Sequence, residues 1–266
     1  MYFAGVDLAW AGRSPTGVAV VDASGALVSV CAVRDDDEIL AALHPYVSGD
    51  CLVAFDAPLV VTNPTGQRPA ETALNRDFRR YEAGTHPCNT GKPEFAAGPR
   101  AGRLAAALGL DLDPRSPAAR RAIEVYPHAA TVALFRLERT LKYKAKPGRT
   151  VDALRSELSL LMDGVERLAR APVPLHVAGH AGWAALRRAV AAAQRKSELR
   201  RAEDPVDAVV CAYVGLYAQR NPANVTIYGD RDTGCIVTPS PPVDRSPRVA
   251  VVRSSRAADR WARAPR

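Results

Sequence analysis

Two aspartates stand at the ends of apolar segments, where acidic side chains are unusual. Asp7 follows the apolar residues 2–6, and Asp56 follows residues 51–55. A buried carboxylate costs free energy unless a cation or hydrogen bonds compensate its charge. Two carboxylates that meet also repel each other, and Mg²⁺ or Mn²⁺ suits the space between them because these ions prefer carboxylate and water oxygens. The pair therefore indicates a divalent-metal site that Gly5 leaves open to a ligand; the alternative is that each acid only closes a turn.

Asp204 and Asp207 form a second acidic pair, at the start of the apolar stretch 205–218. On a helix, acids three residues apart share a face, so a helix packed beside the sheet could present both to the same metal ions. The same residues also fit a helix start, with Asp204 as the cap, Pro205 as the first helical residue and Asp207 in the first turn. This alternative needs no chemistry, although capping does not exclude metal binding.

Glu124 is a fifth candidate acid. It lies between Ile123 and Val125, so in a strand its side chain points away from the face that these apolar residues bury. It either joins the other acids from the fifth strand or forms a salt bridge with an arginine. The sequence leaves both interpretations open.

Basic residues in two segments are candidates for contact with a phosphate backbone. In the first segment, which contains Arg76, Arg79 and Arg80, the basic residues alternate with Phe78 and Tyr81. This pattern suits phosphate contact and base stacking. The alternative is a solvated helix face with both rings packed inward. The second segment is the loop 142–148. The alternative is that this loop is only solvated and contacts no phosphate. The candidate substrate-binding residues are Arg76, Arg79, Arg80, Lys142 and Lys144.

Hydrophobic periodicity and turn signals predict the elements that position these residues. Strands are expected at residues 2–9, 16–22, 26–33, 51–57 and 121–126, and a closing hairpin at 225–228 and 234–237. Helices are expected at about 35–46, 71–83, 129–141, 150–169, 182–199 and 205–218. The first three strands form an antiparallel meander, and the helical connection makes the fourth strand parallel to the first. Asp7 and Asp56 then lie at the carboxyl ends of neighbouring strands, where open α/β sheets bind ligands.

The predicted fold class is α/β, with a mixed five-stranded sheet flanked by helices. One domain covers residues 1–238, including a loop-rich insertion at about 58–117. The chain has 266 residues and a net charge of +8, of which residues 239–266, with seven arginines and two aspartates, carry +5. We expect this tail to be poorly ordered, and it is either a weak nucleic-acid contact or only a solubilising segment.

The remaining composition argues against a membrane protein and a secreted one. No apolar run approaches the length needed to span a bilayer, and the first residues lack the pattern of a secretory signal. The five cysteines are widely spaced and form no Cys-x-x-Cys pair, which fits a reducing cytoplasm. We therefore expect a cytoplasmic location.

Four motifs, taken in this order, resemble the domain-of-unknown-function family 429, whose members are described as predicted RNase H-like nucleases. The motifs are Gly5-Val6-Asp7-Leu8-Ala9-Trp10, Phe55-Asp56-Ala57-Pro58-Leu59, Glu124-Val125-Tyr126-Pro127-His128-Ala129 and Asp204-Pro205-Val206-Asp207-Ala208. The likeness spans roughly residues 1–240 and implies an RNase H-like fold with a divalent-metal carboxylate site.

The Asp-x-x-Asp pair also resembles the Holliday-junction resolvases of the same superfamily, whose metal-binding acids come from strand one, strand four and the last helix. By this resemblance Asp7, Asp56, Asp204 and Asp207 are the metal ligands, and Glu124 is an additional catalytic acid. Family members often have a histidine before the first helix acid, where this chain has Glu203.

The expected function is hydrolysis of phosphodiester bonds in DNA or RNA with the help of two Mg²⁺ or Mn²⁺ ions, about 4 Å apart. A second hypothesis is an ATP-dependent phosphotransferase of the sugar-kinase and actin group. Residues 11–17 offer only a weak phosphate hairpin for it, and the chain is too short for two copies of that fold. A third hypothesis is a non-catalytic nucleic-acid-binding protein that uses the basic tail.

Overall fold

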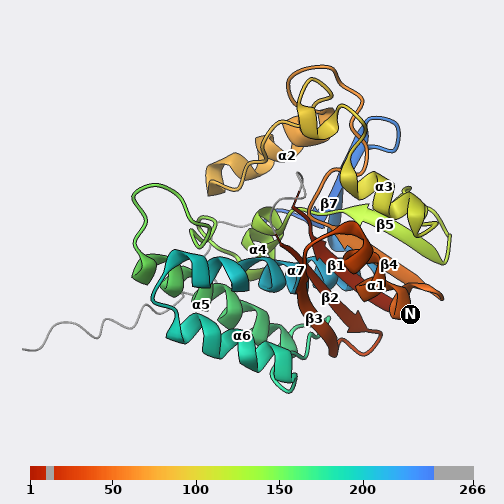
Figure 1. Ribbon diagram of the computed structural model, residues 1–266. Helices are drawn as coiled ribbons and strands as arrows, with labels where there is room; N and C mark the ends of the chain where they lie inside the picture. Colours follow the sequence, from red (N-terminus) through yellow and green to blue (C-terminus); the bar gives the residue numbers. More distant parts are fainter. Residues whose placement is uncertain (10–14, 243–266) are drawn as a thin grey trace, which may run out of the picture.

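The structure is a computed structural model that describes residues 1–9 and 15–242 (Figure 1). Its centre is a five-stranded sheet with the strand order β3-β2-β1-β4-β5. The strands are β1 (Tyr2–Asp7), β2 (Thr16–Asp22), β3 (Leu27–Val33), β4 (Cys51–Phe55) and β5 (Arg120–Glu124). β2 is antiparallel to β1 and β3, whereas β4 is parallel to β1 and β5. The mixed five-stranded sheet predicted from the sequence is confirmed.

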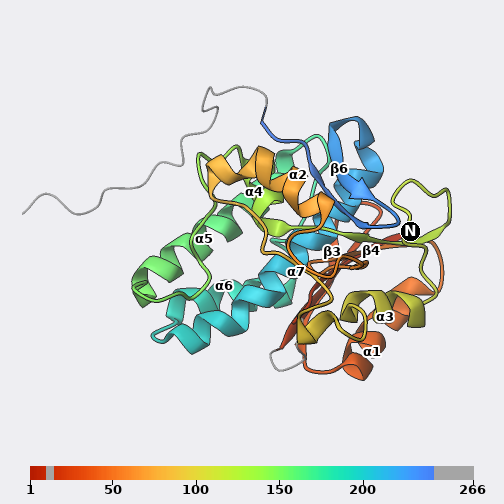
Figure 2. The same ribbon diagram turned by 90° about the horizontal axis from the view of Figure 1, so that it is seen from above.

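Helices cover both faces of this sheet, with α1 and α3 on one side and α5, α6 and α7 on the other (Figure 2). The helices are α1 (Asp36–Val47), α2 (Pro69–Phe78), α3 (Arg100–Ala107), α4 (Pro127–Phe135), α5 (Val151–Arg167), α6 (Ala181–Ala192) and α7 (Lys196–Arg220). Short 3-10 turns are η1 (Arg79–Tyr81), η2 (Pro93–Phe95), η3 (Leu168–Arg170) and η4 (Pro222–Asn224). Strand alternation explains the two cores: Ala4 and Val6 pack beneath α1, whereas Phe3 packs beneath α7. Asp7 therefore lies on the α7 side of the sheet.

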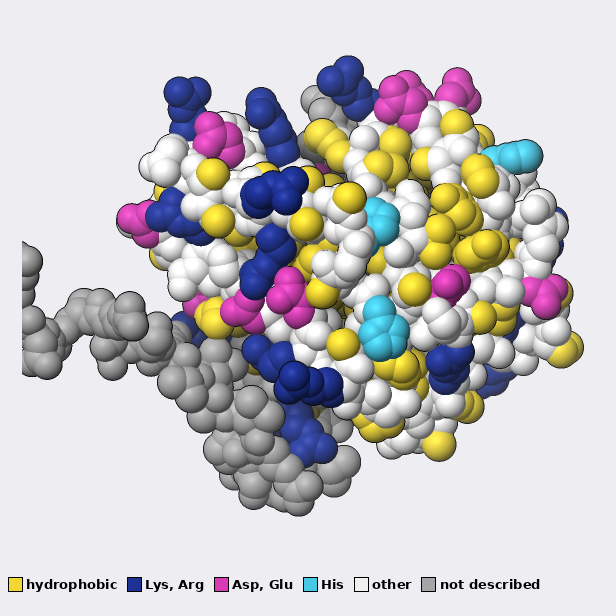
Figure 3. Space-filling view, turned by 90° about the horizontal axis from the view of Figure 1, so that it is seen from below, with side chains coloured by type: hydrophobic (Ala, Val, Ile, Leu, Met, Phe, Trp, Pro, Cys, Tyr) yellow, Lys and Arg dark blue, Asp and Glu magenta, His cyan; other side chains and the backbone are white. Residues whose placement is uncertain are grey.

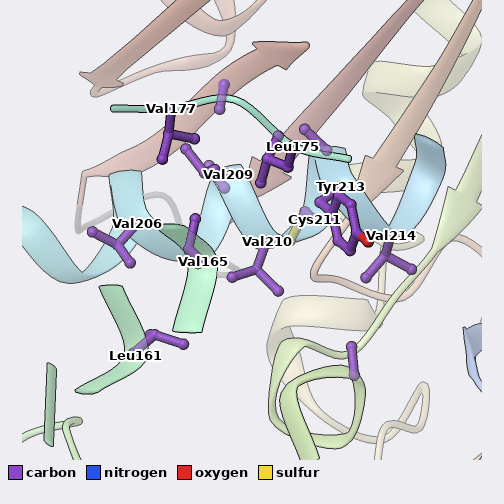
Figure 4. Packing of buried hydrophobic residues seen from close by; sticks show 14 of the residues in the cluster. Leu161, Val165, Leu175, Val177, Val206, Val209, Val210, Cys211, Tyr213 and Val214 are labelled. Carbon is purple, nitrogen blue, oxygen red and sulfur yellow. The ribbon is translucent and has the colours of Figure 1, made fainter. Parts of the chain in front are cut away.

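Helix α7 is the most deeply buried helix, and its valines pack against α5 and the segment 175–177 (Figure 4). Two glycines let its backbone touch the sheet. A Cβ at Gly5 would lie 2.0 Å from the carbonyl oxygen of Ala208, and a Cβ at Gly17 would lie 1.9 Å from that of Asp204. The expectation that Gly5 leaves room for a ligand is therefore wrong, because α7 fills that space.

Three predicted helix boundaries are wrong. The helix expected at 182–199 is two helices, because α6 ends at Ala192 and α7 begins at Lys196. Asp204 and Pro205 consequently lie inside α7, so Asp204 does not cap a helix. The helix expected to reach residue 141 ends at Phe135, because Arg136 adopts a left-handed conformation with φ of 52°.

The segment after β4 carries α2, which packs against α4 and against the hairpin β6 (Val225–Asp230) and β7 (Gly234–Pro239). The hairpin was expected at this place and is confirmed. Residues 243–266, which include nearly all of the predicted basic tail, lie outside the described residues. On the face opposite α2, Lys and Arg side chains are interspersed with acidic and apolar ones (Figure 3). Within the described ranges, no helix combines the length and apolar character needed to cross a bilayer.

Candidate metal and phosphate site

Four of the five predicted acids meet at one edge of the sheet. Asp7 ends β1, and Asp56 follows the neighbouring β4, where its backbone N–H donates to the carbonyl oxygen of Val6 over 2.8 Å. Asp204 and Asp207 reach the same edge from α7. The Asp7 carboxylate lies within hydrogen-bonding reach of both Asp56 and Asp204. The four side chains are called the acid cluster below.

Lys144 lies at the centre of the acid cluster. Its Nζ is 2.5 Å from Oδ2 of Asp207, 3.3 Å from Oδ2 of Asp7 and 3.8 Å from Oδ1 of Asp204. The sequence predicted Lys144 as a phosphate contact, but the structure places its ammonium among carboxylates. Here it occupies the position of a cation that neutralises the acids.

Hydrogen bonds from Arg149 and to Glu157 hold the loop that carries Lys144. The Arg149 guanidinium donates to the carbonyl oxygen of Lys144 over 2.7 Å and to that of Lys142 over 3.2 Å. The backbone N–H of Lys142 donates to Glu157 of α5 over 2.9 Å. These bonds satisfy the backbone of an otherwise irregular segment, so the loop can hold the Lys144 side chain toward the sheet edge.

One ammonium does not compensate all the carboxylates of the acid cluster. Burial raises the pKa of Asp7 well above its ordinary value, and the pKa of Asp56 to about 7, although Lys144 opposes both shifts. Burial also raises the pKa of Asp204. Burial disfavours the charged form of Lys144, but the attraction of Asp207 and Asp7 prevails and raises its pKa well above the usual range. The site therefore favours additional positive charge or protons.

The donor chemistry of the acid cluster fits Mg²⁺ or Mn²⁺, since it consists only of carboxylate oxygens. Oδ2 of Asp207 is buried and accepts no aligned hydrogen bond, although the Lys144 ammonium lies close to it. Within residues 1–9 and 15–242, no group of three or more His, Cys, Asp or Glu side chains is arranged to hold a metal ion. Because the Lys144 ammonium contacts three of the carboxylates, a divalent ion would have to share the cluster with it or replace it.

Glu203 is a neighbouring acid that the sequence prediction of the site did not include. Its side chain is buried, its Oε1 has no hydrogen-bond partner, and burial raises its pKa to about 7, with a further contribution from Asp207 and Asp204. The relevant signal was present in the sequence, because positions 203 and 207 are four apart and share a helix face.

Glu124 does not belong to the acid cluster. It accepts two hydrogen bonds from the buried Arg68, whose Nη1 lies 2.9 Å from Oε2 and whose Nη2 lies 2.5 Å from Oε1. Arg68 also pairs with Glu71 over 2.9 Å, and the backbone N–H of Leu59 donates to Glu124 over 3.2 Å. The salt-bridge interpretation of Glu124 therefore describes its contacts in the structure.

A cleft of about 370 Å³ opens beside the acid cluster, and Asp7 and Asp56 form part of its wall. Four basic residues of one loop line another part of it: Lys142, Lys144, Lys146 and Arg149. The Lys142 ammonium pairs with Glu82 over 2.6 Å. The exposed side chain of Lys146 makes no hydrogen bond or ion pair within the described part of the chain. The cleft thus places acids and free positive charge next to each other.

Aromatic rings form a further part of the cleft wall. Tyr126 and His128 lie with ring centroids 5.6 Å apart, and the Tyr126 hydroxyl donates to the carbonyl oxygen of Gly84 over 3.0 Å. Burial lowers the pKa of His128 to about 4, so its imidazole is neutral near pH 7. Tyr143, beside His128, donates its hydroxyl to Oδ1 of Asp207 over 2.8 Å and orients that carboxylate. None of these rings had been predicted as a site residue.

The three arginines near α2 do not line the cleft. Arg76 is exposed and lies 3.8 Å from Asp77, and the Arg80 guanidinium stacks over the ring of Tyr81. Arg79 begins η1 beside them. Phe78 is fully buried, so it packs inward, as the solvated-face alternative expects. Of the predicted substrate-binding residues, only Lys142 and Lys144 belong to the cleft.

Comparisons with known proteins identify a family. No curated protein and no solved structure matches the chain. The family model described as "Protein of unknown function (DUF429)" matches residues 5–233, a range that contains every member of the acid cluster together with Lys144 and Glu203. This range is well over half of the 266 residues, and the chain therefore belongs to the DUF429 family.

Proposed function

We propose that the protein is a divalent-metal-dependent hydrolase of phosphodiester bonds in nucleic acid. The observation that carries this proposal is the acid cluster, which stands at the carboxyl end of parallel strands and contributes Asp7 and Asp56 to the wall of a cleft lined with lysines. Carboxylates gather cations, and lysines gather phosphates, so the two together suit a phosphate ester held at a metal site. The order of the strands agrees with the RNase H-like resemblance of the sequence.

In this function the acid cluster holds the cation. Asp7, which lies within reach of Asp56 and Asp204, would hold the cation together with these two acids and Asp207. When bound, the ions would activate a water and stabilise the leaving oxygen. Tyr143 keeps the Asp207 carboxylate in orientation, and the ammonium of Lys146 on the cleft wall, which is unpaired among the described residues, attracts the phosphate.

Calorimetry with Mn²⁺ on the purified full chain tests the metal site, and incubation with single- and double-stranded DNA and RNA tests the activity. We expect heat of binding, Mn²⁺-dependent cleavage of at least one substrate, and loss of cleavage in Asp7→Asn. The matched control is Asp152→Asn, which removes a carboxylate that is 84% exposed on α5.

Absence of divalent-metal binding would overturn the proposal. If metal binds but Asp7→Asn cleaves as the wild type does, the acid cluster is not the catalytic site. If nucleic acid binds equally to the wild type and to Asp7→Asn, and neither cleaves it, the protein is a non-catalytic binder instead.

A further inference from the structure

The cleft beside the acid cluster combines three kinds of lining within one small volume. Carboxylates stand on one part of its wall, the lysines of the loop 142–146 on another, and the rings of Tyr126, His128 and His86 on a third. A volume of about 370 Å³ is at the lower end of the range for small-ligand sites. A ligand that satisfies all three linings has a phosphate, a flat ring and a size near that of one nucleotide.

The positive part of the wall has an ammonium that is free to take a phosphate. Lys144 is engaged by the acid cluster and Lys142 by Glu82, while Arg149 is used to hold the loop. Lys146 is exposed and has no such partner within the described residues. A phosphate that enters between Lys146 and the acid cluster would also lie beside the proposed metal ligands.

The aromatic part of the wall is held in place and is not charged at neutral pH. The hydrogen bond from Tyr126 to Gly84 fixes the tyrosine ring, and His128 is held by a 3.1 Å hydrogen bond to Thr140. Because the imidazole is neutral, it does not compete with Lys146 for the phosphate. Aromatic side chains that line a binding site can stack nucleic-acid bases without regard to sequence.

A base can reach these rings only if it is unpaired. In a duplex the base faces are covered by their neighbours, and enzymes that need a base in a pocket must first take it out of the stack. We propose that the cleft binds a single unpaired nucleotide unit, with its phosphate between Lys146 and the acid cluster and its base against Tyr126 and His128. This inference rests on the proposed function and narrows it to single-stranded or locally unpaired substrates.

Binding measured in EDTA separates this inference from the hydrolysis proposal, because no metal-dependent cleavage can then occur. The probes are a fluorescein-labelled ten-nucleotide oligothymidylate and its duplex with oligoadenylate, followed by fluorescence anisotropy on the full chain. We expect the single strand to bind at least about tenfold more tightly than the duplex, since stacking of one base is worth about 1–3 kcal/mol. Equal or tighter binding of the duplex would overturn the inference, whatever the cleavage assay shows.

Two substitutions of one residue separate stacking from a structural role. Tyr126→Leu should weaken binding of the single strand about tenfold, whereas Tyr126→Phe, which keeps the ring and loses only the hydrogen bond to Gly84, should stay within about twofold of the wild type. Loss of binding in both variants, or in neither, contradicts a stacking role. Thermal denaturation of each variant checks that it is folded.

A charge substitution tests the phosphate position independently of the tyrosine. Lys146→Gln should weaken binding and reduce the slope of log Kd against the logarithm of the salt concentration by about one. The matched control is Arg170→Gln, which removes an exposed charge in η3, outside the cleft lining, and should leave both values unchanged. An effect of Arg170→Gln equal to that of Lys146→Gln would place the phosphate elsewhere.

Competition with thymidine monophosphate identifies the source of the nucleotide unit. Displacement of the oligonucleotide at a concentration of monophosphate near the Kd of the strand would assign the cleft to free nucleotides. Displacement only at far higher concentration would assign it to a strand. Failure of any thymidine phosphate to displace the probe would show that the strand binds outside the cleft and would overturn the inference.

Discussion

At the scale of single residues, the acid cluster is governed by charge balance. Lys144 contacts three carboxylates, and burial still raises the pKa of Asp7 and Asp56. Two unit charges about 4 Å apart interact by about 4 kcal/mol at an effective dielectric constant of 20, so a single ammonium has a large effect on its neighbours. Lys144 and a metal ion consequently compete for the same oxygens.

Lys144→Met should bind Mn²⁺ at least about tenfold more tightly than the wild type, because the competing ammonium is gone. Without metal the same variant should lose about 3–5 kcal/mol of unfolding free energy, since buried carboxylates are left without a partner. Calorimetry and thermal denaturation with and without Mn²⁺ measure both effects. Lys146→Met, which removes an ammonium outside the acid cluster, is the control. Unchanged or weaker metal binding in Lys144→Met would show that the two cations do not compete.

His128 should make the folded state sensitive to acid. Its pKa is near 4 in the folded protein and near 6.5 in the unfolded chain, so between these values only the unfolded chain binds the proton. The free energy of unfolding is therefore not reduced by His128 above pH 6.5. As the pH falls from 6.5 toward 4, His128 lowers it by up to about 3 kcal/mol. Buried carboxyl groups with raised pKa values shift stability in the opposite direction over the same range.

The comparison of wild type with His128→Asn isolates the histidine from those carboxyl groups. Asparagine can keep a hydrogen bond to Thr140 but does not titrate. Urea denaturation at several pH values should show the wild type losing stability relative to His128→Asn from pH 6.5 to pH 4. Parallel curves for the two proteins would mean that the imidazole is not buried in its neutral form.

Strand ends predicted that Asp7 and Asp56 meet, because parallel neighbouring strands bring their carboxyl ends together, and helix spacing predicted that Asp204 and Asp207 share a face beside them. The partner of each acid was less predictable. Glu124 pairs with Arg68, which is 56 positions away in the chain, and Lys144 reaches the acids from an irregular loop. No periodic pattern encodes such contacts between distant segments.

At the scale of elements, the position of the acids depends on how closely α7 approaches the sheet. Pro205 inside the helix cannot donate a backbone hydrogen bond and costs about 3 kcal/mol relative to alanine. Burial of the residues from Val206 to Leu216 offsets this cost. Pro205 favoured a helix start at that position, but the helix begins at Lys196, where the Glu198 carboxylate accepts a hydrogen bond from the backbone N–H of Arg195.

Gly5→Ala should displace α7 and with it Asp204 and Asp207. The added Cβ would lie 2.0 Å from the Ala208 carbonyl oxygen, which is backbone and cannot turn aside. We expect a loss of about 3 kcal/mol or more in unfolding free energy, together with weaker Mn²⁺ binding. Denaturant unfolding and calorimetry measure the two.

Gly215→Ala is the matched control within the same contact. Its Cβ would meet Ala54 at 3.7 Å, an ordinary van der Waals distance. Alanine also favours the helix by up to about 1 kcal/mol, so stability should stay the same or rise. If Gly5→Ala is tolerated as well as Gly215→Ala, the close approach of β1 and α7 does not position the acids.

At the scale of the whole molecule, a buried ion cluster ties the segment after β4 to the sheet. Arg68 bonds Glu124 at the end of β5, Glu71 of α2 and the carbonyl oxygen of Val60. The sequence predicted the sheet and an insertion, but the path of the insertion follows from this cluster and from the packing of α2 on the hairpin. Composition alone describes such a segment only as loop-rich.

Arg68→Met should cost about 3–5 kcal/mol of unfolding free energy, because two buried carboxylates lose their partner. Urea denaturation measures the loss. Arg76→Met, a change at a side chain that is 78% exposed, should shift stability by less than about 0.5 kcal/mol. A small effect of Arg68→Met would mean that Glu71 and Glu124 become protonated or hydrated at little cost.

The contact between Gly5 and α7 also has a consequence for the order of events during synthesis. The first strand and the last helix are separated by about 200 residues, and a contact of such high sequence separation forms late in folding. On the ribosome, β1 and β4 emerge long before α7 leaves the exit tunnel. The nascent chain therefore carries Asp7 and Asp56 without their helical partners, and the acid cluster is completed only after α7 has emerged.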